Sequence, residues 1–406
     1  MEEGEAAAPA LTGSPARFGL TLGVLSSIGP LSVDLYLPAL PWMATELHAS
    51  PGDLQRTLSI FFLALAAAQI PIGSVSDRVG RKPVLVIGFS LFIAASALCA
   101  TTTSVDALLA FRFLQGFSIC AGTVVSRAMI RDLASGPAAA RLMATSFLII
   151  GLSPVLAPLL GSYLLQFMTW RGLFDVLALA GAFGLLLAHW AVPESLPPQK
   201  RIPRGTPVLP AYGKLLANRG FIRGALVAGL ATTIPFAYVT AAPFVLTGQF
   251  GLDSRTYSLL LGINAVCSIG MMQLAPGFMR RWGARPLLVT VSFAGAVLCL
   301  AMVMVLGLGA MNLVVFQIFS MLLFALAGIA LTPAAITALD ASSGGAGTAA
   351  SALGAVQLAV TAAASGAVSL FPAFSVLPLL VIVGTSFLGA FLLSQTSSKE
   401  GQPHAR

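Results

Sequence analysis

Charged side chains are rare inside the apolar stretches of this sequence, and the few found there are the candidates for chemistry. Asp34 is the only acidic residue well inside such a stretch, and Arg112 is the clearest basic one. A charge placed inside a membrane is costly and usually serves function. Because a carboxyl group can bind and release a proton, and a nearby arginine changes that equilibrium, we expect Asp34 to carry a proton and Arg112 to tune it.

Structural roles are the alternatives for both residues. Asp34 lies a few residues before Pro38 and Pro41, where it could be a hydrogen-bonded residue at a helix end near the outer surface. Arg112 lies near the start of its apolar stretch. There it could anchor the helix by an ion pair or a backbone hydrogen bond, or extend toward the lipid headgroups.

Other kinds of chemistry find no support in the sequence. The three histidines, His48, His189 and His404, have no metal-ligand spacing, and no GxxxxGK[ST] loop for a nucleoside triphosphate occurs. No Ser–His–Asp or Cys–His arrangement indicates hydrolysis, and the four cysteines lie in apolar runs as packing residues. We therefore expect no cofactor, no metal and no enzymatic activity.

The composition identifies the elements that must position these residues. Hydrophobic residues make up 57% of the 406 residues and charged residues only 9%, against about 25% charged residues in a typical soluble domain. This predicts an all-α polytopic membrane protein with twelve transmembrane helices. The predicted spans lie near 18–41, 54–75, 84–103, 107–128, 138–164, 171–192, 221–246, 255–278, 285–307, 311–338, 346–370 and 373–394.

The basic residues predict the orientation of these spans. With both termini in the cytoplasm, eighteen of the twenty-two Lys and Arg residues are cytoplasmic and only Arg56, Arg171 and Arg255 are outside, as the positive-inside rule requires. The net charge of +8 is therefore assigned to this asymmetry and not to nucleic-acid binding.

The predicted domains are a cytoplasmic tail (1–17), an N-terminal half (18–192), a cytoplasmic proline-rich linker (193–220) that forms a semi-stiff tether, a C-terminal half (221–394) and a second cytoplasmic tail (395–406).

The two halves contain an internal repeat. The segment DRVGRKPVLV (77–86) aligns without gaps onto RRWGARPLLV (280–289), with five identical residues and one Lys–Arg exchange at an offset of 203 residues. An offset of half the chain length between corresponding spans indicates a duplicated unit. Parallel repeats of this kind place a substrate site between the halves, near the middle of the bilayer.

The segment GSVSDRVGRKPVL (73–85), between the second and third spans, carries the most specific motif of the chain. It resembles the signature loop of the major facilitator superfamily, Gly-x-x-x-Asp-Arg-x-Gly-Arg-Lys, and the residues that match are Gly73, Asp77, Arg78, Gly80, Arg81 and Lys82. The resemblance implies the major facilitator fold of two pseudo-symmetric six-helix halves. It also implies that Asp77 controls conformational switching, within reach of Arg127, Arg131 and the start of the eleventh span.

Further segments are similar to the drug–proton antiporter branch of that superfamily, which includes bicyclomycin- and chloramphenicol-resistance transporters. Arg112, Gln115 and Gly116 match the Arg-x-x-Gln-Gly motif of the superfamily as a whole. The stretch GLSPVLAPLLGSYL (151–164) is similar to the antiporter motif of that branch at Gly151, Pro154, Pro158 and Gly161, although Ser162 stands where a second glycine is common. DLYLPALP (34–41) and GTAASALGAVQ (347–357) are also similar to that branch. The two prolines predict a bend or a weakened hydrogen-bond ladder in the fifth span.

The resemblance implies proton-coupled efflux, by antiport, of small amphipathic compounds such as antibiotics across the bacterial inner membrane by alternating access. The alternative is a proton-coupled transporter of a polar metabolite such as a sugar or nucleoside. A monomer in the lipid bilayer is expected, with the substrate and protons as partners. Polar residues inside spans, each of which taken singly is more often a hydrogen bond between helices than a ligand contact, could together line a substrate cavity with aromatic walls. They are Tyr36, Gln69, Gln115, Tyr238, Asn264 and Gln357, with Phe61 and Phe236 as walls.

Overall fold

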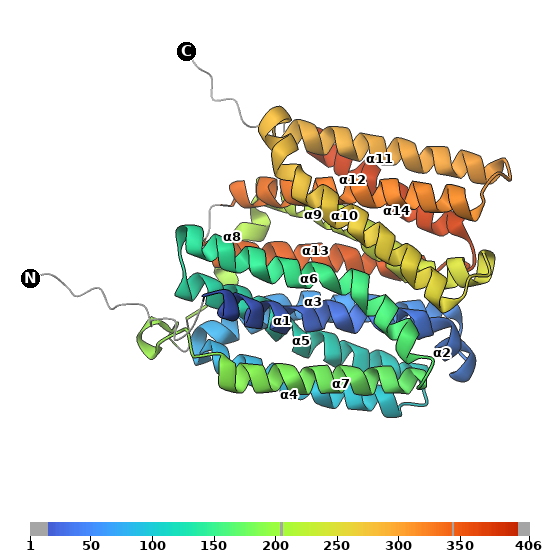
Figure 1. Ribbon diagram of the computed structural model, residues 1–406. Helices are drawn as coiled ribbons and strands as arrows, with labels where there is room; N and C mark the ends of the chain where they lie inside the picture. Colours follow the sequence, from blue (N-terminus) through green and yellow to red (C-terminus); the bar gives the residue numbers. More distant parts are fainter. Residues whose placement is uncertain (1–14, 204–205, 343–344, 397–406) are drawn as a thin grey trace, which may run out of the picture.

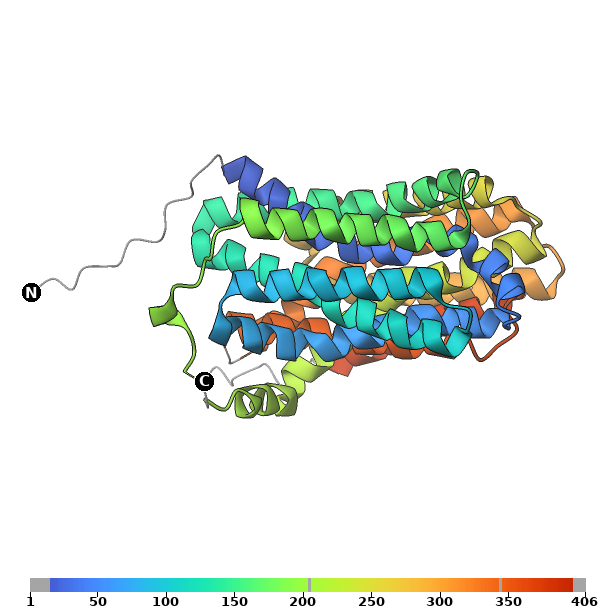
Figure 2. The same ribbon diagram turned by 90° about the horizontal axis from the view of Figure 1, so that it is seen from below.

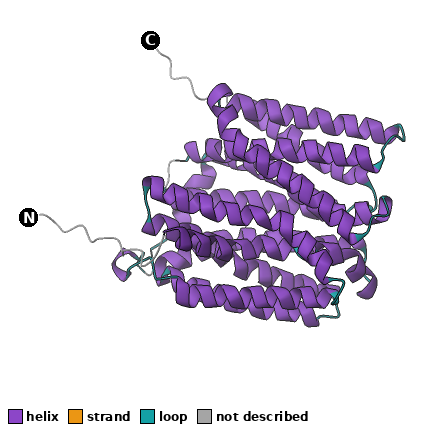
Figure 3. Ribbon diagram, in the orientation of Figure 1, coloured by secondary structure: helices purple, strands orange, loops and turns teal. Residues whose placement is uncertain are grey.

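The computed structural model describes residues 15–203, 206–342 and 345–396. Within these ranges every regular element is a helix (Figure 3). Twelve helical segments are long and apolar enough to cross a membrane, in agreement with the twelve predicted spans. Most of the two predicted tails falls on residues 1–14 and 397–406, which lie outside the described part of the chain.

The spanning helices form two consecutive groups of six, as predicted. The N-terminal half contains α1 (Pro15–Asp34), α3 (Pro51–Val79), α4 (Arg81–Thr101), α5 (Val105–Leu133), α6 (Gly136–Leu164) and α7 (Trp170–Leu186). The C-terminal half contains α9 (Arg219–Phe244), α10 (Ser254–Trp282), α11 (Ala284–Gly307), α12 (Leu313–Asp340), α13 (Ala346–Val368) and α14 (Val376–Thr396). In Figure 1 the first group forms the lower part of the bundle and the second group the upper part.

Short elements extend or connect these helices. The first span continues past the end of α1 through η1 (Leu37–Ala39) and α2 (Leu40–Glu46), so it is not the single helix expected over 18–41. Segments of π-helix, η2 (Leu187–Ala191) and η4 (Val245–Gln249), follow α7 and α9. The linker contains η3 (Pro198–Lys200) and a helix, α8 (Leu209–Ala217), with a proline in its first turn, where proline is tolerated.

The internal repeat is visible in the helix boundaries. Helix α3 ends and α4 begins around Gly80, and α10 ends and α11 begins around Gly283, a displacement of 283 − 80 = 203 residues. Both glycines have positive φ, at 108° and 82°, a conformation that residues with a Cβ avoid. The predicted duplication is therefore present in the backbone and not only in the sequence.

Two helix pairs make the most extensive contacts between the halves: α3 packs against α13, and α6 packs against α10. We call these contacts the α3–α13 seam and the α6–α10 seam. The spanning helices run along one common direction (Figures 1 and 2), and α8 lies at one end of the bundle. We call that end the linker side and the other end the opposite side. Helix α6 continues through Pro154 and Pro158 without a break in its helical assignment.

Candidate functional site

The first span is interrupted directly after Asp34. Helix α1 ends at this residue, and the chain turns through Tyr36 into η1, which has Pro38 in its first turn. Because proline has no N–H to donate, the hydrogen-bond ladder of α1 cannot continue through it. Asp34 is buried, with 5% of its surface exposed. Among the described residues it has no hydrogen-bond or ion-pair partner, so its charge is open to neutralisation by a proton or a ligand.

Gly161 of the predicted antiporter motif packs against this interruption. A Cβ on Gly161 would overlap the carbonyl oxygen of Leu35, the residue after Asp34. Only glycine permits the backbone of α6 to approach so closely. The motif glycine thus fixes the position of the chain where the buried carboxylate lies.

Arg112 is fully buried and points into the N-terminal half, not toward the headgroups. Its guanidinium carbon lies 4.4 Å from the ring centroids of both Tyr36 and Phe61. Its Nη1 donates to the carbonyl oxygen of Ser32 at 3.1 Å and to Oε1 of Gln115 at 2.5 Å. Arg112 thus holds the residues on both sides of Asp34, although no ion pair within 4.0 Å joins it to any described carboxylate.

Three residues of the predicted substrate set belong to the surroundings of Arg112. Gln115 Nε2 donates to Ser96 Oγ at 2.7 Å, and the hydroxyls of Tyr36 and Thr57 share a hydrogen bond of 2.8 Å. Phe61 is fully buried beneath the guanidinium. The Tyr36 hydroxyl and the Gln115 amide thus have hydrogen-bond partners inside the N-terminal half.

Tyr257 on α10, in the other half, interacts electrostatically with Asp34 and was not singled out by the sequence analysis. It is fully buried, and its hydroxyl has no hydrogen-bond partner among the described residues. Electrostatic interactions connect it with Asp34, Tyr36 and Tyr238. The halves also meet here through Ser254 Oγ, which donates to the carbonyl oxygen of Pro38 at 3.5 Å. An aromatic residue one turn inside a span is typical of an anchor at the membrane interface. The sequence pattern therefore did not indicate that Tyr257 lies between the two halves.

Two further residues of the predicted substrate set, Gln69 and Phe236, lie at the contact between the halves. Gln69 of α3 meets Gly354 of α13, where an added Cβ would lie 3.3 Å from the glutamine amide. Phe236 of α9 packs on Phe62 of α3, with ring centroids 4.8 Å apart. Gln55, missed by the sequence analysis, is fully buried on α3, and both of its amide atoms lack a partner in the described structure.

Within the C-terminal half, Tyr238 and Asn264 are buried polar residues with unused hydrogen-bonding capacity. Asn264 Oδ1 accepts from Gln317 Nε2 at 2.9 Å. The Tyr238 hydroxyl and Asn264 Nδ2 have no partner among the described residues. Gln357 lies on α13 beside Gly229 of α9. The predicted substrate set is therefore divided between the core of the N-terminal half, the α3–α13 seam and the C-terminal half.

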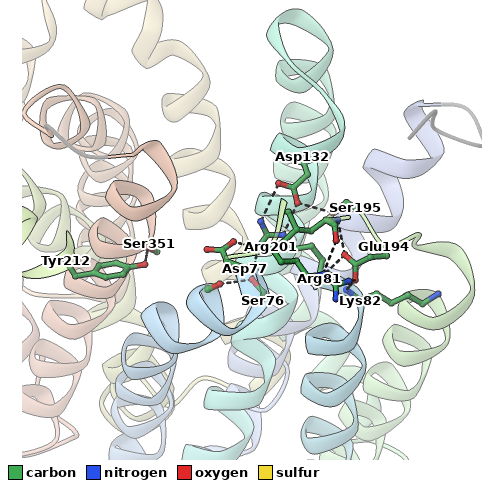
Figure 4. Close-up of polar contacts among 12 residues, drawn as sticks. Ser76, Asp77, Arg81, Lys82, Asp132, Glu194, Ser195, Arg201, Tyr212 and Ser351 are labelled. Atoms are coloured by element: carbon green, nitrogen blue, oxygen red, sulfur yellow. Dashed lines mark hydrogen bonds and ion pairs between the residues drawn. The ribbon is translucent and has the colours of Figure 1, made fainter. Parts of the chain in front are cut away.

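The signature loop forms an ion-pair network at the linker side (Figure 4). Arg81 donates to Asp77 Oδ1 at 2.5 Å and to Asp132 Oδ2 at 2.8 Å. Glu194 of the linker accepts the backbone N–H groups of Arg81 and Lys82, at 2.9 and 3.2 Å, and so caps the first turn of α4. Two further bonds tie the loop to the linker: Arg78 Nη2 to the carbonyl oxygen of Thr206, at 2.7 Å, and Ile202 N–H to that of Asp77, at 3.0 Å.

The structure has twelve spans in two repeated halves and carries this loop between its second and third spans. Residues 22–369 match the Major Facilitator Superfamily. The chain belongs to this superfamily. It is accordingly a multi-pass membrane transporter of small molecules and not an enzyme. A solved D-xylose–proton symporter has the same fold, with a TM-score of 0.68, 18% sequence identity, and 95% of this chain and 96% of that one covered.

Relatives with higher identity cover part of the chain. A Bacillus subtilis (strain 168) protein described as an uncharacterized MFS-type transporter, YdgK, is 38% identical over 61% of this chain. The alignment spans 62% of that relative, less than two thirds of its length. A Haemophilus influenzae (strain ATCC 51907 / DSM 11121 / KW20 / Rd) protein described as a bicyclomycin resistance protein homolog is 32% identical over 67% of this chain and 68% of its own. These relatives agree with the predicted drug-antiporter branch of the superfamily.

In this superfamily member, the glycines of α6 and α10 differ in how closely other atoms approach them. A Cβ added to Gly151 of α6 would lie 3.8 Å from Ile269 of α10. A Cβ added to Gly262 of α10 would lie 3.6 Å from the carbonyl oxygen of Val155 of α6. At Gly270 and Gly277, nearer the linker side, an added Cβ would have no neighbour within 4 Å. Figure 1 shows that α10 runs obliquely across the bundle.

Arg127 and Arg131 do not pair with Asp77, whose carboxylate is bound to Arg81. The guanidinium of Arg127 lies 5.9 Å from the ring centroid of Phe147 on α6. Arg131 faces the start of α13, where a Cβ on Gly347 would lie 3.4 Å from its guanidinium nitrogens. Arg131, one of the predicted switch residues, thus contacts the start of the eleventh span.

Proposed function

We propose that this transporter exports small amphipathic compounds in exchange for protons across the bacterial inner membrane. The observation that carries the proposal is Asp34, a buried carboxylate without a partner among the described residues. It lies at the interruption of the first span and interacts electrostatically with Tyr257 of the other half. Antiport requires one group whose proton occupancy and substrate occupancy are linked. The name of the bicyclomycin resistance homolog supports drug efflux as the activity.

The chemistry of the contact between the halves supports an amphipathic substrate. Phe62 and Phe236 provide aromatic surface there, and Gln55 and Tyr257 provide buried donors and acceptors that lack partners in the described structure. A few unpaired polar groups among apolar side chains are typical of sites for small, mostly apolar ligands. A small compound with one or two hydrogen-bonding groups would satisfy these atoms.

Alternating access is the proposed mechanism. The halves touch on the opposite side through Ser254 and Pro38, and on the linker side through Arg131 and the start of α13. Alternating access requires that these two sets of contacts open in turn. Protonation of Asp34 would remove a buried charge from the junction of the halves and so shift the balance between the two open states.

Transport by purified protein in proteoliposomes tests this function. An imposed gradient with an acidic lumen should drive accumulation of labelled chloramphenicol or bicyclomycin, while a pH dye in the lumen reports proton exit. Labelled xylose serves as the polar comparison. Accumulation of xylose but not of the drugs would favour a metabolite transporter, and drug accumulation that ignores the gradient would contradict proton coupling.

For the orientation, we propose that the linker side faces the cytoplasm. Single cysteines replacing Gln199 and Thr103, both exposed and at opposite ends of the bundle, are introduced into a variant without the native cysteines. In intact cells a membrane-impermeant maleimide should label Thr103→Cys and not Gln199→Cys, and inverted vesicles should give the reverse. Labelling of both positions from one side would contradict the proposed topology.

Asp77 is proposed to control the conformational change from the linker side, through its ion pair with Arg81. Asp77→Asn should lower the transport rate roughly tenfold, a change within the range typical of coupling between distant sites. Substrate affinity, measured by equilibrium binding to the purified protein, should stay within about twofold. Asp106→Asn, an exposed acid on the opposite side, is the matched control. Parallel loss of binding and transport would argue against a switch role.

A further inference from the structure

Two arginines of α5, Arg127 and Arg131, have no part in the ion-pair network at the linker side. They lie four residues apart and therefore share one face of the helix. Both are exposed, and neither forms an ion pair with a described carboxylate. We call these two residues the arginine pair.

The arginine pair faces the other half of the transporter. Helix α5 packs against α1, α3 and α4 of its own half. Beyond these helices, Arg127 lies over the exposed ring of Phe147 on α6, with its guanidinium carbon 5.9 Å from the ring centroid. Arg131 lies at the start of α13, where a Cβ on Gly347 would be 3.4 Å from its guanidinium nitrogens. The pair is therefore located where α6 and the first turn of α13 meet α5 on the linker side.

No acidic side chain of the described structure pairs with these arginines. Helices α6 and α13 contain no acidic residue. Among the described residues, four acidic side chains lie on the linker side, namely Asp77, Asp132, Glu194 and Asp340. The first three form ion pairs with Arg81 or Arg201. Asp340, the last residue of α12, forms no ion pair with Arg127 or Arg131.

The internal repeat shows that the fold does not require charge at these positions. At the offset of 203, the counterparts of Arg127 and Arg131 on α12 are Ala330 and Ala334, and both are buried. The positive-inside rule accounts for basic residues in the loops of this side. Arg127, however, lies more than one turn inside α5, which ends at Leu133. The arginine pair is thus a feature of the N-terminal half at the level where a compound would enter between the halves.

We propose that the arginine pair makes the linker-side entrance select against cations, so that the exported compounds are uncharged. The inference rests on the proposed efflux from the linker side and narrows its substrate class. A wall with one sign of charge lowers the local concentration of ions of that sign. The ring of Phe147 would attract a cation, but the Arg127 guanidinium already lies over it. An uncharged amphipathic compound meets no repulsion there.

Accumulation of two labelled probes in proteoliposomes with an acidic lumen tests the proposal. The probes are uncharged chloramphenicol and the lipophilic cation tetraphenylphosphonium, with the membrane potential held at zero by potassium and valinomycin. The readout is the rate ratio of the cation to chloramphenicol, because a change in conformational switching affects both probes alike. Arg127→Gln with Arg131→Gln should raise this ratio about tenfold. Arg127→Lys with Arg131→Lys keeps the charge and should leave the ratio low.

The matched control is Lys200→Gln with Lys214→Gln, which removes two exposed positive charges of the linker and should not change the ratio. A salt series with the unmodified protein decides the matter if the double glutamine variant does not fold. Raising the ionic strength from about 0.01 M to about 1 M shortens the screening length from about 30 Å to about 3 Å, so the ratio should rise.

Equal rates for both probes in the unmodified protein, an unchanged ratio in the glutamine variant, or the same rise in the control would overturn the proposal. In each of these cases accumulation would still follow the pH gradient. Failure of the proposed function would differ, because accumulation of both probes would then be independent of the gradient.

Discussion

Replacing Asp34 by asparagine should abolish gradient-driven export while leaving substrate binding and substrate exchange intact. Asparagine has nearly the same shape as a protonated aspartate but cannot release a proton. A membrane potential of 100 mV contributes about 2.3 kcal/mol per charge, so one proton per cycle sustains about a fiftyfold concentration ratio. In the Asp34→Asn protein this ratio should fall to one, as measured by drug accumulation in proteoliposomes.

The matched control for this variant is Asp175→Asn, the same chemical change at an exposed acidic residue of α7. It should accumulate drug like the unmodified protein. Proton release on drug addition, followed in detergent solution, gives a second readout that requires no membrane potential. If the Asp34→Asn protein still releases protons and accumulates drug, the proton carrier lies elsewhere and Asp34 has the structural role considered above.

Replacing Arg112 by methionine should separate transport from stability. A buried guanidinium without a carboxylate partner is costly, and methionine fills a similar volume between Tyr36 and Phe61 without a charge. The midpoint of thermal unfolding should therefore stay the same or rise. Transport should fall at least tenfold, within the range for coupling of distant sites, because the residues beside Asp34 lose the hydrogen bond to Ser32 and both ring contacts.

Arg112→Lys tests whether charge alone is sufficient. An ammonium keeps the charge but cannot stack between two rings as a planar guanidinium does, so transport should stay low. Arg56→Met is the matched control, because Arg56 forms an exposed ion pair with Asp53. It should leave transport unchanged and should change the free energy of unfolding by no more than about 1 kcal/mol. Should Arg112→Met lower the unfolding midpoint and transport in proportion, Arg112 would be a structural residue only.

Three features could be predicted from the sequence because each depends on local properties. They are the number of spans, the duplication, and the match between the loop at Gly80 and the loop at Gly283. Burial in lipid favours apolar residues over lengths of about 20 residues, so each span has its own pattern. The loop with Gly80 and its repeat around Gly283 could be aligned because the same positive φ demands glycine at both positions. The scarcity of charge inside spans likewise directed attention to Asp34 and Arg112 before any packing was known.

Side-chain partners could not be predicted in the same way. The sequence contains Gln115 and Tyr257 as two polar residues inside spans. The Gln115 amide is hydrogen-bonded to Arg112 and Ser96, whereas the Tyr257 hydroxyl has no partner among the described residues. Which of these occurs depends on how each helix is rotated about its axis against its neighbours. Lipid tails and the protein interior are both apolar, so the two faces of a spanning helix differ little in polarity and the residue pattern does not specify that rotation.

Membership of a twelve-span, duplicated transporter family follows from the residues alone, because helix length, loop charge and turn chemistry are set locally along the chain. Three other features depend on the packed bundle: Asp34 ends α1 without a partner among the described residues, Arg81 and not Arg131 binds Asp77, and Glu194 caps α4 from the linker. The last of these contacts joins residues 113 positions apart. Such contacts form only when packing brings distant segments of the chain together. The residues around either partner do not indicate which distant residue will lie beside it.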